Sequence, residues 1–254
     1  MRPFSWRFIR MWQRNRDVFL RLWHAEAPGF VAEPVLILLA MGLGLGAYVG
    51  LVDGQRYIEF ITPGIIASYA MFSASFECTY GSFWRMEHQR TYDAIIATPL
   101  NVEDVIAGEI FWGATRSLMT GTIILIIAAA FQLVHSPWAL LIPIITFLEG
   151  IMFASIAILF TSIVPAIYSF NYYFTLFVTP MFFFSGVFFP LTSFPEIVRT
   201  LSWVVPLTPV VHLTRALFNG ELQLSLLWAL ALIIVLTLVF FSISLVTMRR
   251  RLTV

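Results

Sequence analysis

Long apolar stretches separated by short polar segments run through almost the whole chain. The most extreme stretch, residues 150–195, contains 46 residues without one charged side chain. A helix needs about 20 residues to cross the roughly 30 Å hydrocarbon core of a bilayer. This stretch is therefore long enough for two spans, with a turn where Pro165 interrupts it. The pattern predicts a protein whose main solvent is the bilayer.

Six stretches are long enough and poor enough in polar residues to cross a membrane. We expect them at Ala32–Val52, Phe60–Phe83, Val105–Val134, Trp138–Val164, Ser169–Phe189 and Leu224–Met248. The predicted fold class is an all-α membrane protein in which residues 1–254 form a single transmembrane domain. Residues 32–189 hold the first five spans, and residues 224–248 hold the sixth.

Composition supports this interpretation and limits the chemistry. The chain is 59% hydrophobic and 11% charged, and its net charge of +1 indicates no nucleic-acid partner. The single cysteine excludes an intrachain disulfide. All fifteen basic residues are arginines, so the lysine that a P-loop uses to reach ATP phosphates is absent. We expect no cofactor in this chain, and ATP with Mg²⁺ would have to bind a partner.

The distribution of arginine predicts the orientation. Eleven arginines fall on one side of the predicted membrane: Arg2, Arg7, Arg10, Arg14, Arg16, Arg21, Arg85, Arg90, Arg249, Arg250 and Arg251. Three fall on the other side, at Arg56, Arg199 and Arg215. Because basic residues concentrate in cytoplasmic loops, we expect a multi-pass membrane protein with both termini in the cytoplasm.

Residues 1–29 have the pattern of an amphipathic helix. Arg7, Arg10 and Arg14 fall on one helical face, whereas Phe8 and Trp12 fall on the other. Such a helix lies in the cytoplasmic interface with its arginines toward anionic headgroups. The alternative is that these arginines only set the topology.

Residues 190–223 form an external link by this topology, although they are strongly apolar. Pro195, Pro206 and Pro209 divide the link into short pieces. Irregular backbone at membrane depth is tolerated where protein or a cavity covers it. We therefore expect two short re-entrant or interfacial helices before the last span, the alternative being a folded loop that rests on the membrane.

Ionisable residues within the spans are candidate functional groups because their burial is costly. The candidates for a polar pathway are Glu77, Glu109, Arg116 and Glu149. The sequence predicts an Arg116–Glu149 pair, which would either line a substrate path or join two helices structurally. An ion- or proton-coupled carrier that uses Glu109, Arg116 and Glu149 is the alternative function.

Glycines and aromatic residues mark two further candidate surfaces. Gly42, Gly46 and Gly50 form small-xxx-small steps that allow close helix approach, within one subunit or across a dimer. Phenylalanines between Phe182 and Phe189 predict either an interfacial belt or a path for an amphipathic glycolipid. The chain has no H-E-x-x-H or G-x-S-x-G motif, so we expect neither catalytic residues nor a metal site.

The polar segment Met86–Asn101 joins the second and third spans on the cytoplasmic side. Glu87, Arg90 and Asp93 recur at helical spacing, and Pro99 ends that helix. Asn101 and Asp104 resemble an N-cap box that opens the next span. A short amphipathic helix of this kind either docks in a partner's groove or is a solvated linker.

Several of these motifs together resemble the type-two ABC export permeases, and in particular the membrane subunits of nodulation-factor exporters. The matching residues are Glu33-Pro34, Gly42, Gly44, Gly46, residues 87–99, Gly108-Glu109-Ile110, Trp112, Ala114-Thr115, residues 179–181, residues 184–190, Pro206-Leu207 and Arg215. The resemblance implies six spans, a homodimer and two copies of a separate ATPase on the cytoplasmic loop. It also implies export of a lipo-oligosaccharide or another amphipathic glycolipid, with a hydrophobic drug-like molecule as the other substrate class.

Overall fold

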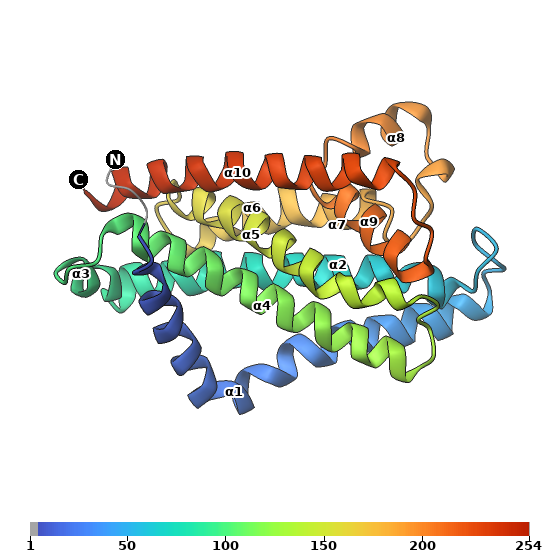
Figure 1. The fold of residues 1–254 in the computed structure, drawn as a ribbon, viewed down its shortest axis with the longest axis horizontal. Coiled ribbons are helices and arrows are strands. Elements are labelled where there is room, and N and C mark those ends of the chain that lie inside the picture. The colour runs from blue at the N-terminus through green and yellow to red at the C-terminus, as the bar shows by residue number, and fades with distance from the viewer. Residues whose placement is uncertain (1–4, 254) are drawn as a thin grey trace.

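The computed structural model describes residues 5–253, so Arg2 lies outside the described residues. These residues are mainly helical, and the β pairing among them is one isolated bridge between Val52 and Gln55. Figure 1 shows an elongated bundle in which α3 and the end of α10 lie at one end, here called the α3 end. The α-helices are α1 (Phe8–Leu39), α2 (Tyr57–Phe76), α3 (Thr91–Ile96), α4 (Val102–Ala130), α5 (Ile142–Thr161), α6 (Phe170–Tyr173), α7 (Thr179–Phe184), α8 (Glu196–Ser202), α9 (Leu207–Asn219) and α10 (Ser225–Leu252). The predicted all-α fold is confirmed.

Three of the predicted spans are single apolar helices long enough to cross a bilayer. Within the described residues they are Val102–Ala130, Pro137–Thr161 and Ser225–Leu252. The bent pair α8 and α9 is a further candidate if it counts as one span. These helices match the bounds of the third, fourth and sixth predicted spans within a few residues, and six crossings remain a prediction.

The N-terminal segment and the first predicted span form one helix, not two. α1 runs from Phe8 to Leu39 and bends sharply midway along its length (Figure 1). Pro28 and Pro34 lie inside it, and proline interrupts the helical hydrogen-bond ladder and kinks a helix. The apolar part ends at Ala47 instead of Val52 after a wide turn at Ala40–Gly44 and a tight one at Leu45–Ala47.

The second and fifth predicted spans contain wide π-type turns. α2 continues through Glu77–Gly81 and Trp84–His88, so this helical segment extends beyond Phe83. The fifth segment has such a turn at Phe174–Val178, two residues before Pro180, whose missing N–H cannot continue the ladder. Its helix ends at Phe184 instead of Phe189, because Gly186 adopts a left-handed φ of 78°.

The link before α10 contains the two predicted short helices, α8 and α9, which are bent by 87° relative to each other. α9 is largely buried. Its Arg215 donates to the Gly186 carbonyl at 2.8 Å and to the Phe60 carbonyl at 3.3 Å. The link is therefore anchored to α2 and to the turn after α7.

Small residues allow α4 and α5 to pack closely in the centre of the bundle. A Cβ on Gly150 would lie 2.7 Å from the Ala114 Cα, and one on Gly121 would lie 2.6 Å from the Thr146 Cγ2. Membrane helices gain their association energy largely from such backbone approach. This pair is the packed centre against which α1 and α2 form the site described next.

Candidate functional site

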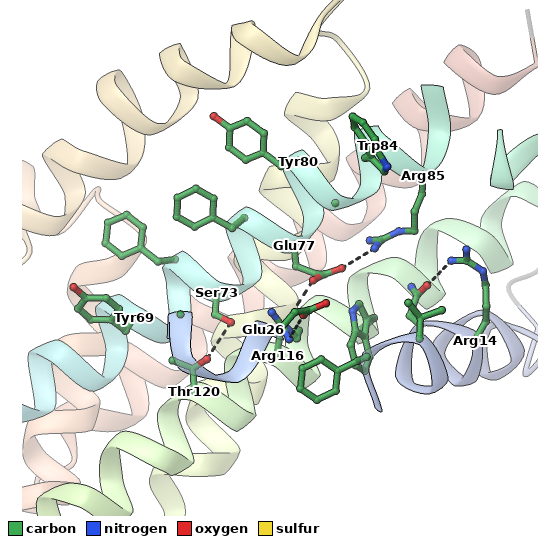
Figure 2. Close-up of a pocket in the computed structure, with 18 of the residues that line it drawn as sticks. Arg14, Glu26, Tyr69, Ser73, Glu77, Tyr80, Trp84, Arg85, Arg116 and Thr120 are labelled. Atoms are coloured by element: carbon green, nitrogen blue, oxygen red, sulfur yellow. Dashed lines mark hydrogen bonds and ion pairs between the residues drawn. The ribbon is translucent and has the colours of Figure 1, made fainter. Parts of the chain in front are cut away.

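A groove of about 770 Å³ lies between α1 and the surface formed by α2 and α4 (Figure 2). One wall is a row of aromatic side chains along α2 and its extension, here called the aromatic ladder: Tyr69, Phe72, Phe76, Tyr80 and Trp84. The last three are spaced four residues apart, which keeps them on one face as the helix widens into π-type turns. Phe76 and Trp84 are about half exposed, at 49% and 48%. The wall therefore offers flat apolar surface to a bound molecule.

A chain of alternating charges lies beside the aromatic ladder, and Figure 2 labels its members Glu26, Arg116, Glu77 and Arg85. Arg116 pairs with Glu26 at 2.8 Å and with Glu77 at 3.6 Å. Arg85 pairs with Glu77 at 2.8 Å and with Glu109 at 2.5 Å. We call these five residues the charge chain, and they join α1, the α2 extension and α4. Paired charges of this kind avoid much of the cost of an isolated charge in a membrane interior.

Glu109 is the most deeply buried member of the charge chain. Its side chain is fully buried, and it accepts hydrogen bonds from Ser82 at 2.7 Å and from Asn15 at 3.2 Å. Asn15 belongs to the N-terminal half of α1, whose Trp12 also donates to Thr115 of α4 at 2.8 Å. The apolar face predicted for residues 1–29 therefore packs partly on α4.

Glu149 does not pair with Arg116, contrary to the sequence-based prediction. Arg116 is engaged with Glu26 and Glu77, on the side of α4 that faces α1 and α2. Glu149 lies on α5, is fully buried and has no hydrogen-bond partner within the described part of the chain. Similar depth along two antiparallel helices does not fix which faces meet, and here they differ.

The structure brings Glu77, Glu109 and Arg116 together as sequence reasoning grouped them, but that reasoning missed Glu26 and Arg85. The carboxylate of Glu26 interrupts an apolar stretch, and Arg85 follows Glu77 by eight residues, or two four-residue steps. The sequence alone could therefore have indicated both residues. The spacing of Arg85 from Glu77 was missed because Arg85 was counted only among the charges that set the topology.

The predicted glycine face and the fifth-span aromatics separate in the structure. A Cβ on Gly42 would lie 2.5 Å from the Ile58 side chain, so Gly42 packs within the subunit. Gly46 has only ordinary contacts, and Gly50 lies outside the helix with nothing within 4 Å. Phe182 contacts Phe72 of the aromatic ladder with ring centroids 5.5 Å apart, whereas Phe189 is half exposed.

The segment between α2 and α4 is not one helix through Glu87, Arg90 and Asp93. Arg90 adopts a left-handed φ of 51°, which ends the α2 extension before α3 begins. Glu87 pairs with Arg251 at 2.9 Å, whereas Arg90 and Asp93 pair weakly at 3.5 Å and are 73% and 63% exposed. The Pro99 carbonyl accepts from Arg7 at 2.7 Å.

The predicted N-cap box at the start of α4 is confirmed. The Asn101 N–H donates to the Asp104 carboxylate at 3.3 Å. The same carboxylate accepts from the Ser5 hydroxyl at 2.9 Å. The segment is therefore attached to both ends of the chain while part of its polar surface stays exposed.

Comparisons with known proteins agree with this architecture. The family model described as ABC-2 type transporter matches residues 7–219. The chain is 39% identical over 211 residues to Nodulation protein J of Sinorhizobium fredii (strain NBRC 101917 / NGR234), covering 83% of this chain and 80% of the relative. It is 34% identical over 251 residues to Nodulation protein J of Rhizobium meliloti (strain 1021), covering 98% and 95%. Inner membrane transport permease YadH of Escherichia coli (strain K12) is 24% identical over 235 residues, covering 92% and 91%. The chain belongs to the ABC-2 type transporter family and is a membrane permease subunit, not an enzyme.

Proposed function

We propose that two copies of this permease form an exporter driven by two copies of an ABC ATPase. The exporter moves an amphipathic glycolipid of the lipo-oligosaccharide class out of the cytoplasm or the inner leaflet. ATP and Mg²⁺ bind the ATPase, since this chain has no lysine for a P-loop. The chain lies in a bacterial inner membrane with six crossings, and both termini and the α3 end face the cytoplasm. Eleven arginines on that side support this orientation.

The substrate proposal rests on one observation, which is that the groove combines an aromatic surface with a set of charged groups. The aromatic ladder gives flat faces against which sugar rings and acyl chains pack, and the charge chain gives carboxylates and guanidinium groups that bind hydroxyl groups. A molecule with an apolar tail and a hydroxyl-rich head meets both walls. A hydrophobic drug-like molecule would use the aromatic ladder alone.

The ion-coupled alternative loses its main support. Such a carrier needs an ionisable group that can exchange its ion, but Glu109 is bonded to Arg85, Ser82 and Asn15. Arg116 is also paired, and Glu149 lies apart from both. These contacts favour the ATP-driven exporter over an ion-coupled carrier.

Replacing Trp84 tests the groove. Trp84→Ala should weaken the apparent affinity for a fluorescent lipo-oligosaccharide about twofold to tenfold, the effect of losing roughly 0.5–1.5 kcal/mol of aromatic contact. Trp228→Ala is the matched control, because Trp228 is 71% exposed on α10 and does not line the groove. The measurement is ATP-dependent transport by permease and ATPase in proteoliposomes. Equal transport by the two variants would place the substrate path elsewhere.

A further inference from the structure

Three consecutive arginines, Arg249, Arg250 and Arg251, lie at the end of α10, and their surroundings differ. Arg249 pairs with Glu103 at the start of α4 at 2.8 Å, with 43% of its own side chain exposed. Arg251 reaches into the bundle, with 20% exposed. Arg250 is exposed, and within the described residues its side chain forms no hydrogen bond or ion pair. The three arginines thus carry the same charge but make different contacts.

Arg251 connects the ends of three helices through one guanidinium group. Its Nη1 donates to the carbonyls of Thr161 at 2.5 Å and Val164 at 2.7 Å, at the end of α5. Its Nη2 donates to the Glu87 carboxylate at 2.9 Å, on the α2 extension. The guanidinium also lies over the Phe83 ring, 5.6 Å from its centroid.

The chemistry of each contact explains why arginine suits this position. The last carbonyls of a helix have no partner within the helix and carry partial negative charge, so a cation that donates to them is stabilising. A guanidinium has five N–H donors in a fixed planar fork and can serve the carbonyls and a carboxylate at once. A lysine ammonium is a compact point charge and lacks that fork.

We infer that Arg251 is a positioning residue that transmits movement of residues 86–101 to the ends of α5 and α10. The inference rests on the proposed function, with the ATPase acting on residues 86–101, the cytoplasmic segment on which the resemblance to export permeases implies that it docks. Glu87 is the last carboxylate before the helix breaks at Arg90, so a displacement of this segment reaches Arg251 directly. A second tie nearby, from the Thr161 hydroxyl to the Cys78 carbonyl at 2.9 Å, holds α5 to the α2 extension independently.

Topology is the competing explanation, because arginines near the end of a span also hold it in the cytoplasm. Arg250 separates the two explanations. Arg250→Gln and Arg251→Gln each remove one positive charge from the same turn of α10, so they weaken the topological signal equally. Only Arg251→Gln removes the contacts with α5 and Glu87.

The test measures coupling in proteoliposomes that contain the permease and its ATPase. We expect Arg251→Gln to lower the amount of fluorescent lipo-oligosaccharide moved per ATP hydrolysed by about fivefold or more, the lower range of measured coupling between sites. ATPase binding and insertion should remain at the parental level. Glu87→Gln should lower the same ratio while leaving the α5 contacts intact, and Arg251→Lys should recover it only in part. Arg250→Gln should match the parent.

A distance measurement tests the same inference without a transported substrate. Spin labels at exposed Ala97 and Ile163, in a Cys78→Ser background, report the separation of residues 86–101 from the end of α5. This separation should stay constant on ATP binding in the parent and in Arg250→Gln, and change in Arg251→Gln. If Arg251→Gln matches Arg250→Gln in both experiments, the inference is wrong. If the parental complex transports nothing but the distance results hold, the substrate proposal fails and the transmission stands.

Discussion

Removing Arg85 should leave one buried carboxylate without its cation, and the structure identifies which one. Arg85 pairs with both Glu77 and Glu109, and its side chain is 14% exposed. Glu77 retains Arg116 at 3.6 Å after the change. Glu109 is fully buried, and among the described residues it keeps hydrogen bonds only from the neutral donors Ser82 and Asn15. Removing one partner of a buried ion pair costs about 3–5 kcal/mol, so Arg85→Gln should lower the free energy of unfolding by that amount.

Adding Glu109→Gln tests whether Glu109 is the carboxylate that loses its cation. Arg85→Gln with Glu109→Gln removes both charges and should recover most of the loss, since the stranded carboxylate is its main source. Arg16→Gln is the control, because Arg16 and Asp17 are 41% and 55% exposed and a surface pair contributes about 0–1 kcal/mol. The assay is unfolding by SDS in mixed micelles, followed by tryptophan fluorescence. Additive losses in the double variant would refute the assignment of Glu109 as the stranded charge.

Two further variants test Glu149 and the exposed pair of Arg90 and Asp93. Glu149→Gln should leave the folded yield and the thermal midpoint near the parental values. A buried carboxyl group without a partner is far less costly to bury as the neutral acid, and an amide closely matches that acid in shape. A large loss of folded protein would indicate an ionised Glu149. Combining Arg90→Glu with Asp93→Arg keeps their mutual pair but inverts an exposed charge pattern. The double variant should therefore weaken the binding of the ATPase by about 2 kcal/mol or more. Co-purification of the ATPase measures the second effect, and unchanged binding would remove these residues from the docking surface.

Hydrophobic pattern predicted the helices well because span length and apolar composition are properties of local sequence. α4, α5 and α10 lie close to their predicted positions. The breaks were less predictable. The wide turn at Phe174–Val178 is associated with Pro180, but the left-handed residue that ends the α2 extension is Arg90, which carries no glycine or proline signal. Such breaks depend on tertiary contacts that no local pattern encodes.

The charge chain shows a different limit of sequence reasoning. Helical periodicity placed Glu109 and Arg116 on one face, and in the structure Arg85 and Glu77 connect the two side chains. Periodicity gives the face of each helix but not the neighbouring helix that this face contacts. The predicted pairing of Arg116 with Glu149 was therefore wrong. The correct partner, Glu26, comes from a segment interpreted as a separate interfacial helix, whereas α1 is continuous and bends back toward α4.

The two kinds of contact in this bundle divide it into a rigid and an adjustable part. α4 and α5 meet through Gly121 and Gly150 with no space for another methyl group, so relative movement there would cause clashes or open voids. The start of α1 packs just as closely on α4, since a Cβ on Gly108 would overlap the Met11 Cβ. Beside the groove, however, the contacts of α1 include the charge chain. Polar contacts can exchange partners as helices shift, whereas interlocked packing cannot do so gradually. The groove therefore lies where the fold can change its width, and Arg251 lies where α5 of the rigid pair meets residues 86–101.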